Sequence, residues 1–382
     1  MTPTIRLGRL FGIEVGFNWS LIVIFVLVAW TLASSVLPGA APGQPVLAYW
    51  LVGLAGAVVF FVCLLAHEFA HAIAARRRGM KVGGITLWLF GGVSQLEGEP
   101  PSPGAEALIT GVGPLASLVV AGVAYAVAVA GATAGAPALL IQLAGWLAFL
   151  NLALAVFNLV PAFPLDGGRL LGSFFWWRTG SRQRGVRDAV RVGRVVALLM
   201  IGLGLVELFV GSIVSGIWIA FIGWFLLSAA GAELAAMEVR TTLRSVPVSA
   251  AMSSPVVTVP EWIRVEDFLA SAASQHHFTT YPLHALSGEL TGVVRLRDLL
   301  RASAADRAAM TLRDLARPIA EMPRAHPEES LGVVIERVGS ALENRVLVFA
   351  DGNLVGIVSP SDVARILTLR QALASRHPRA VA

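Results

Sequence analysis

Six long apolar segments constrain this chain more than any other feature of its sequence. They lie near residues 17–37, 46–75, 107–131, 137–160, 190–210 and 213–235. A helix needs about 20 mainly apolar residues to cross a hydrocarbon core about 30 Å thick, and each segment is long enough. Only 14% of all residues are charged, whereas about 25% is usual for a soluble domain. The sequence therefore predicts a polytopic α-helical membrane protein with six transmembrane helices.

The basic residues before residue 240 predict the orientation of these helices. They are confined to the N-terminus, to the stretch from Arg76 to Lys81, and to the stretch from Arg169 to Arg194. Loops rich in Lys and Arg stay in the cytoplasm. We therefore expect a multi-pass protein of the cell membrane whose N-terminus and C-terminal domain are both cytoplasmic. This pattern accounts for the net charge of +5 without a nucleic-acid partner, and no removable signal peptide is expected.

Polar residues with metal-binding spacing stand at the end of the second apolar segment, in LLAHEFAHAIAARRRG. His67 and His71 are four residues apart on a helix, so both rings project from one face and can share one metal ion. Glu68 is rotated by about 100° and can reach a metal-bound water without being a ligand. His67 lies about 13 Å inside the cytoplasmic boundary that Arg76 marks. Ionisable residues at such a depth are functional candidates.

A catalytic zinc ion generally takes three protein ligands and leaves one position for water. The candidate for the third ligand is Asp166 in the stretch NLVPAFPLDGGR, where prolines and glycines break the helix. Arg169 marks the cytoplasmic edge here, which places Asp166 at about the depth of His67. Capping of a turn is the alternative role for Asp166.

These residues together predict metal-assisted hydrolysis. Zinc would lower the pKa of its water toward neutrality and polarise a scissile carbonyl. Glu68 would take the proton and pass it to the leaving amine. Asn158, two turns before Asp166, would donate to the developing oxyanion; the alternative is that it joins two helices.

The stretch VGGITLWLFGGVSQLEGEPPSPG, residues 82–104, contains two short β-favouring runs on either side of Gly91 and Gly92. It predicts a small membrane-associated β-hairpin followed by a Pro-rich loop. Such a backbone must be buried in protein or line a cavity. A cytoplasmic connecting loop is the alternative.

The composition changes after residue 240, where charged residues are frequent and no apolar run reaches the length of a span. GELTGVVRLRDLL, residues 288–300, recurs in outline as GNLVGIVSPSDVA, residues 352–364. Two copies of one supersecondary unit are expected, each a helix, two strands and a second helix. The predicted divisions are a transmembrane domain 1–240, repeats 245–304 and 309–370, and a tail 371–382.

HEFAH at 67–71, NLVPAFPLDGGR at 158–169, LFGGV at 89–93 and GPLAS at 113–117 resemble motifs of the site-2 protease family, the intramembrane zinc metalloproteases of peptidase family M50. The resemblance implies one zinc ion per chain on His67, His71 and Asp166, with Glu68 as the catalytic glutamate and Asn158 near the scissile carbonyl.

The same resemblance implies regulated intramembrane proteolysis. The reaction would be hydrolysis of a peptide bond within or beside the transmembrane helix of a single-pass membrane protein, such as an anti-sigma factor. The hairpin at Gly91 and Gly92 resembles the β-element of the family, which is proposed to pair with the extended substrate.

The C-terminal part resembles a tandem pair of cystathionine-β-synthase (CBS) domains, a soluble α/β unit. The resemblance implies ATP or AMP as a ligand, with Ser359 and Asp362 of the second copy as its contacts, and a homodimer formed through the pair. The first copy has Arg295 in place of the hydroxyl residue, so one nucleotide site is expected. A platform used only for dimerisation is the alternative.

Two other functions remain open at this point: a membrane transporter gated by the CBS pair, and a catalytically inactive scaffold that senses nucleotide. No inverted repeat in the six segments supports a transporter, and an intact Glu68 argues against the inactive scaffold. Glu68→Gln separates the three, because only hydrolysis should be lost.

Overall fold

The computed structural model describes residues 4–88, 91–275, 278–339 and 345–376 of the chain. Two compact units are present, Met1–Ala235 and Ala236–Ala382. The turn residues 89 and 90 of the predicted hairpin lie outside the described residues. Each unit is described by itself.

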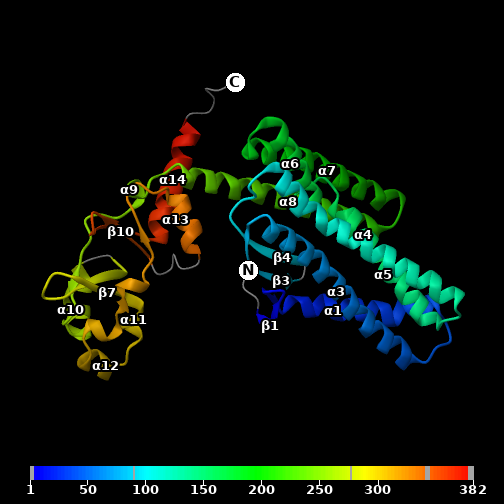
Figure 1. The fold of residues 1–382 in the computed structure, drawn as a ribbon, viewed down its shortest axis with the longest axis horizontal. Helices are drawn as coiled ribbons and strands as arrows, with labels where there is room; N and C mark the ends of the chain where they lie inside the picture. The colour runs from blue at the N-terminus through cyan, green and yellow to red at the C-terminus, as the bar shows by residue number, and fades with distance from the viewer. Residues whose placement is uncertain (1–3, 89–90, 276–277, 340–344, 377–382) are drawn as a thin grey trace. The chain divides into compact units, whose positions relative to one another are not determined.

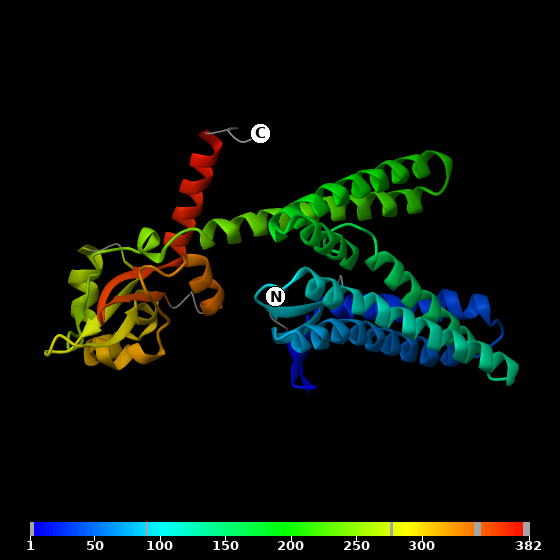
Figure 2. The ribbon, with the colours of Figure 1, turned by 45° about the horizontal axis from the view of Figure 1, so that its top comes forward.

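Among the described residues, six helices are long and apolar enough to cross a membrane, as the sequence predicts, and the last of them continues past Ala235, where the first unit ends. The first begins as α1 (Ser20–Thr31) and continues to the end of α2 (Leu37–Ala40). The others are α3 (Val46–Arg77), α4 (Pro103–Thr133), α5 (Ala138–Asn158), α7 (Arg182–Val210) and α8 (Ile213–Arg244), while α6 (Asp166–Thr179) is shorter. α1, α3, α4 and α5 run side by side in Figures 1 and 2. Most of their large apolar side chains are exposed, as lipid-facing helices require.

Small residues bring the later helices close together. A Cβ atom added at Gly204 of α7 would lie 2.7 Å from the carbonyl oxygen of Gly216 in α8. At Gly223 it would lie 2.7 Å from the carbonyl oxygen of Ala197. Transmembrane helices associate through such small residues, because lipid provides no hydrophobic driving force.

A four-stranded sheet lies against α3, in the order β1-β2-β3-β4. Its strands are β1 (Ile5–Leu10), β2 (Ile13–Phe17), β3 (Lys81–Trp88) and β4 (Gly91–Glu97). The pairs β1–β2 and β3–β4 are antiparallel, whereas β2 and β3 are parallel, with Val15 opposite Ile85. The predicted hairpin is therefore confirmed as β3–β4, but the sequence analysis missed the N-terminal hairpin that joins it.

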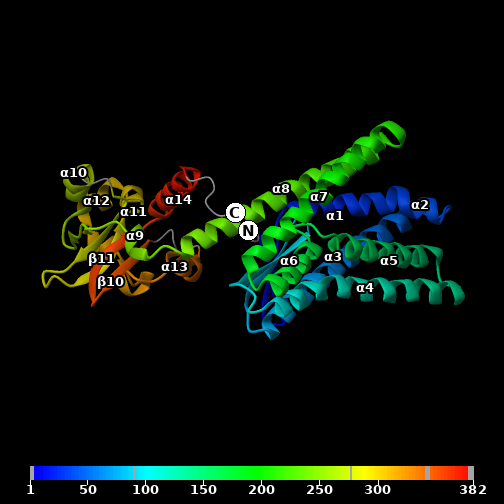
Figure 3. The same cartoon turned by 90° about the horizontal axis from the view of Figure 1, so that it is seen from above.

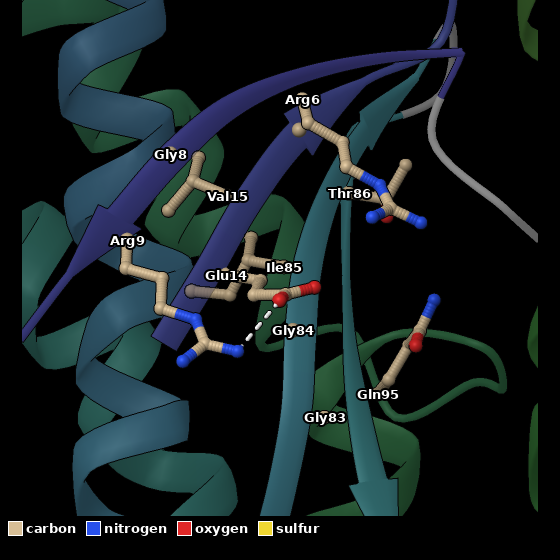
Figure 4. A pocket seen from close by; sticks show the side chains of 11 residues that line it. Arg6, Gly8, Arg9, Glu14, Val15, Gly83, Gly84, Ile85, Thr86 and Gln95 are labelled. Atoms are coloured by element: carbon tan, nitrogen blue, oxygen red, sulfur yellow. Dashed lines mark hydrogen bonds and ion pairs between the residues drawn. The ribbon is translucent and has the colours of Figure 1, made fainter. Parts of the chain in front are cut away.

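The two faces of this sheet differ in chemistry. One face places Ile13, Val15, Ile85 and Leu87 in a core with Phe69 of α3. A hollow of about 120 Å³ lies over β1 to β4 and has glycines 8, 16, 83 and 84 in its lining. Figure 4 shows the ion pair there, in which Arg9 Nη2 lies 2.9 Å from Glu14 Oε1. Both partners of this pair are well exposed.

The second unit contains the two predicted repeats. The first consists of α10 (Val265–Gln275), β6 (Thr280–His284), β7 (Leu290–Arg295) and α11 (Leu296–Arg301). The second consists of α13 (Leu331–Val338), β10 (Val346–Ala350), β11 (Asn353–Val358) and α14 (Pro360–Arg376). Short strands complete the sheets β5-β6-β7-β8 and β11-β10-β9 (Figure 3). They are β5 (Val259–Pro260), β8 (Arg317–Pro318) and β9 (Arg324–Ala325), and two further short helices are α9 (Val248–Ala251) and α12 (Ala304–Ala309).

Each repeat has its own core. Phe268, Tyr281, Leu283 and Leu299 are buried together in the first repeat. Leu331, Val346, Val348 and Val358 are buried together in the second. Val293 of β7 meets Leu347 of β10 in a smaller cluster, which joins the repeats.

Candidate metal centre

Helix α3 carries His67 and His71 on one face, and α4 fixes both rings. His67 Nδ1 lies 2.9 Å from Ser117 Oγ, and His71 Nδ1 lies 2.7 Å from the carbonyl oxygen of Ile109. A carbonyl oxygen can only accept, so His71 donates through Nδ1 and its neutral ring keeps a lone pair on Nε2. This is the arrangement that orients a histidine for metal binding.

Asp166 reaches the same point from the first turn of α6. Its Oδ2 lies 3.3 Å from His67 Nε2 and 3.3 Å from His71 Nε2. The helix break predicted from the prolines and glycines is present, because α5 ends at Asn158 and α6 begins at Asp166. A Cβ atom at Gly168 would lie 2.6 Å from the backbone of Ala162 and Phe163. Glycine is therefore required for the loop to fold back and direct Asp166 towards α3.

The three ligand atoms form a triangle whose size fits zinc. The two Nε2 atoms are 3.2 Å apart, and both are 3.3 Å from Asp166 Oδ2. Metal–ligand bonds of about 2.0–2.1 Å in a tetrahedron give ligand–ligand edges of about 3.3–3.4 Å. Two neutral imidazoles and one carboxylate are also a donor set that zinc accepts. Among the described residues, these are the ones that form a group of three metal-ligating side chains.

Gly113 of α4 keeps space for this triangle. A Cβ atom there would lie 2.7 Å from His67 Nε2 and closer still to the ring of His71. Any side chain at residue 113 would therefore occupy the place where the imidazoles converge. Two residues of the GPLAS motif therefore have a structural role: Gly113 leaves space for the imidazoles, and Ser117 fixes the ring of His67.

Glu68 lies beside the triangle and contacts the sheet. Ser94 Oγ of β4 donates to Glu68 Oε2 over 3.0 Å. A Cβ atom at Gly92 would lie 2.6 Å from Glu68 Cδ and 2.8 Å from its Oε1. The hairpin therefore holds the carboxylate at one side of the metal centre, and Gly92 must be glycine for the carboxylate to stay there.

The other predicted site residues have surroundings of their own. Gly91 has a left-handed backbone, with φ of 126°, and pairs with Trp88 at the end of the hairpin. Asn158 is half-buried at the last position of α5, and within the described residues its side chain makes no hydrogen bond. In the second unit, Asp362 Oδ2 accepts from Ser359 Oγ over 2.6 Å, and Asp362 Oδ1 accepts from Ser253 Oγ over 2.9 Å.

Sequence reasoning missed three supporting features. Ser94 and Ser117 depend on how strands and helices pack, which no local spacing reveals. A buried ion pair also joins α4 to α7, with Arg182 Nη2 3.1 Å from Glu106 Oε1. Glu106 is 6% exposed, and a carboxylate beside an apolar segment was the one available signal of such a pair.

Three features define the class of this protein: a His-Glu-x-x-His helix, a third candidate ligand from another helix, and a glutamate beside them. Together they describe a membrane protein with a metalloprotease-type centre. The comparisons with known proteins give the family. The family model described as "Peptidase family M50" matches residues 55–136 and 129–201. Rip3 of Mycobacterium tuberculosis, which is named as a zinc metalloprotease, is 43% identical over 368 residues, covering 96% of this chain and 93% of Rip3. The chain belongs to peptidase family M50, the site-2 protease family of zinc metalloproteases.

One further relative spans nearly the full chain, and two solved structures match parts of it. The zinc metalloprotease MJ0392 of Methanocaldococcus jannaschii is 26% identical and is matched over 97% of each chain. The solved site-2 protease from the same organism is 27% identical, covers 60% of this chain and 94% of its own, and has a TM-score of 0.41. The CBS domain of a bacterial CNNM/CorC Mg²⁺ transporter, solved in complex with ATP, is 19% identical, covers 35% of this chain and 94% of its own, and has a TM-score of 0.31. The chain itself combines a multi-pass α-helical membrane unit with a C-terminal unit of two α/β repeats.

Proposed function

We propose that this protein is an intramembrane zinc metalloendopeptidase that cleaves a peptide bond within or next to a transmembrane helix of a membrane-tethered regulatory protein. The observation that carries the proposal is the triangle of His67, His71 and Asp166 with Glu68 at its side. The histidines belong to a helix of 32 residues that is long and apolar enough to span a membrane. A peptide bond would therefore be hydrolysed at membrane depth.

In this mechanism each side chain has one task. His67, His71 and Asp166 would hold one zinc ion, which would supply a water of lowered pKa and polarise the scissile carbonyl. Glu68 would act as the general base that takes up a proton from the attacking water and then gives it to the leaving nitrogen. Ser94 orients Glu68 through its hydrogen bond. Asn158 is our candidate donor to the oxyanion, a role that requires its free side chain to turn towards the centre.

The sheet offers a place for the substrate. Among the described strands, β4 has a neighbour on one side only, namely β3. An extended segment can add to such an edge through main-chain hydrogen bonds. Gly91 and Gly92 would lie next to that segment, and Gly92 also contacts Glu68. Strand addition would keep the peptide bond out of a helix, whose hydrogen bonds otherwise shield it.

The experiment that tests the proposal compares wild-type and Glu68→Gln cells by mass spectrometry of membrane proteins and released fragments. A single-pass substrate, of which an anti-sigma factor is one kind, should accumulate only in the mutant. Its cytosolic fragment should appear only in the wild type. Identical profiles after the upstream cut has been supplied, by expressing the candidate in its trimmed form, would overturn the proposal.

We further propose that adenine nucleotide at the CBS pair modulates cleavage. A cavity of about 170 Å³ in the second unit is lined by Ser359 and Asp362, among others. The C-terminal end of α8 is also attached to the second repeat, since Arg244 Nη2 lies 2.9 Å from both carboxylate oxygens of Glu336. Ser330 Oγ donates to the carbonyl oxygen of Arg244 over 2.9 Å. A shift of that repeat would therefore pull on the last residues of a transmembrane helix.

The test of this modulation is the cleavage rate of the purified protein with and without ATP or AMP. Glu336→Ala should abolish the response to nucleotide while leaving the basal rate unchanged, whereas Glu328→Ala serves as a control in the same repeat. A rate indifferent to nucleotide and to deletion of residues 245–382 would refute modulation but leave the protease activity standing.

The location of the protein follows from its basic residues. We place it in the cell membrane among lipids, with both termini cytoplasmic, because Arg76, Arg77 and Arg78 follow the metal-binding turns of α3. We also propose that the CBS pairs of two chains form a homodimer. Cross-linking of the intact protein in membranes, and of a version lacking residues 245–382, tests this assembly.

A further inference from the structure

Two cavities in the second unit share one wall. The first cavity is lined by Ser359 and Asp362, among others. The second cavity is larger, with a volume of about 410 Å³. Thr279, Thr280 and Arg345 line both. The larger cavity is completed from α11 by Arg297 and Leu300 and from α14 by Pro360. A ligand that occupies the first cavity can therefore extend past Arg345 into the second.

The larger cavity has an excess of positive charge. Arg295, Arg297 and Arg345 line it. Asp298 is the acid that faces the first two: its Oδ2 lies 2.6 Å from Arg295 Nε, and its Oδ1 lies 3.6 Å from Arg297 Nε. Within the described residues, Arg345 has no carboxylate in ion-pair contact, and its Nη2 donates to Thr279 Oγ1 over 2.7 Å. Asp298 thus faces two of the three guanidinium groups, and Asp362 is the carboxylate that acts on Arg345.

The partial burial of Arg345 favours the binding of an anion beside its guanidinium group. It lowers the pKa of Arg345, and the charges of Arg295 and Arg297 lower it further, while Asp362 acts in the opposite direction. The residue also has a left-handed backbone, with φ of 70°. Its guanidinium is thus held near two like charges, and an anion placed between the three would relieve their repulsion.

The two repeats offer different chemistry at equivalent positions. In the second repeat, Ser359 precedes α14 and bonds to Asp362, so hydroxyl and carboxylate groups are presented. In the first, Arg295 precedes α11 and bonds to Asp298, so guanidinium is presented where a hydroxyl would be. Sugar hydroxyls suit the Asp362 side, and phosphate groups suit the arginine side, because guanidinium binds phosphate with several charge-assisted hydrogen bonds.

We infer that the cleft takes one nucleotide with at least two phosphates, whose phosphate chain lies against Arg345, Arg297 and Arg295, so that the CBS pair distinguishes ATP and ADP from AMP. The inference rests on the proposed binding of adenine nucleotide to this unit and adds the phosphate requirement to it. Arg295 stands in the first repeat where Ser359 provides a hydroxyl in the second, and this replacement is the feature that selects the ligand.

The test is calorimetric titration of the full-length protein in detergent with ATP, ADP, AMP and inorganic triphosphate. We expect AMP to bind at least about tenfold more weakly than ATP, since it lacks the contacts with the arginine side. Arg297→Gln should weaken ATP by about tenfold and leave AMP unchanged, whereas Arg345→Gln, at a residue that lines both cavities, should weaken ATP more than it weakens AMP. Arg301→Gln is the matched control, because Arg301 ends the same helix, α11, and lines neither cavity.

The outcomes separate the inference from the proposal beneath it. Equal affinities for ATP and AMP, with no effect of Arg297→Gln, would overturn the phosphate requirement but preserve nucleotide binding. Binding of none of the three nucleotides would overturn both. Inorganic triphosphate binding as tightly as ATP would contradict the sugar contacts at Asp362. Arg297 is largely exposed, so its glutamine variant should fold even where Arg345→Gln does not.

Discussion

Single side chains outside the ligand set decide whether the metal centre can form. Ser117 is 1% exposed and is the partner of His67 Nδ1, while the carbonyl of Ile109 serves His71 in the same way. Such partners fix the ring orientation and the tautomer of a ligand. We therefore expect zinc affinity to depend on α4, although α4 provides none of the proposed ligands.

Ser117→Ala should therefore weaken zinc binding by about 10- to 100-fold, because the His67 ring loses its orienting contact. The affinity is measured by competition with a chelator on the purified protein. Ser173→Ala is the control, since Ser173 is also buried but its hydroxyl bonds only to Leu170 of its own helix. Equal affinities in the two variants would contradict the role given to Ser117.

Gly92→Ala should displace the Glu68 carboxylate and reduce kcat by about 10²- to 10⁴-fold, the usual contribution of a general base. Zinc content should stay unchanged, because the nearest atoms to a Cβ atom at Gly92 belong to Glu68, which is not one of the proposed ligands. The matched control is Gly83→Ala on β3, where an added Cβ atom meets its nearest neighbour at 3.6 Å. Cleavage assays combined with metal analysis check both variants; full activity in Gly92→Ala would refute the steric argument.

At the scale of helices, the buried pair Glu106–Arg182 holds α4 next to the connection between α6 and α7. α4 positions the histidines and α6 carries Asp166, so this pair links the two halves of the metal centre. Arg182 Nη1 also lies 3.6 Å from Glu99. Removal of one partner leaves a charge buried without its counter-ion.

Arg182→Ala should accordingly destabilise the membrane unit by about 3 kcal/mol. Thermal unfolding in detergent gives the comparison. Arg191→Ala removes an exposed arginine from the same helix, which pairs with Asp188, and should cost less than about 1 kcal/mol. Similar shifts of the unfolding midpoint would show that the Glu106–Arg182 pair contributes no more than a surface contact.

The sequence predicted those elements whose signals are local. Hydropathy alone locates the six spans, and the prolines and glycines around Asp166 indicate the helix break. The N-terminal strands were missed because Ile5–Leu10 and Ile13–Phe17 are short and stand immediately before an apolar span. Their hairpin is recognisable only afterwards, from the turn at Phe11 and Gly12, both with positive φ. Contacts such as Ser94–Glu68 depend on packing between distant segments, so no local pattern predicts them.

At the scale of the whole molecule, the chain joins a unit that meets lipid to a unit that meets water. The first exposes apolar side chains along its helices, such as Leu199 and Trp218, and brings polar groups together at His67, His71 and Asp166. The second has ordinary α/β cores and a cavity lined by arginines. Our proposals therefore place hydrolysis in the first unit and the response to nucleotide in the second.

The central claim is that one zinc ion is held by these three side chains and serves Glu68. The most direct test is the zinc content of the purified protein, measured by mass spectrometry of the metal alongside cleavage of a substrate. We predict one zinc per chain in the wild type and in Glu68→Gln, with cleavage lost in the latter, and loss of both zinc and cleavage in Asp166→Ala but not in Asp188→Ala. Stoichiometric zinc in Asp166→Ala, or cleavage by Glu68→Gln, would contradict the account.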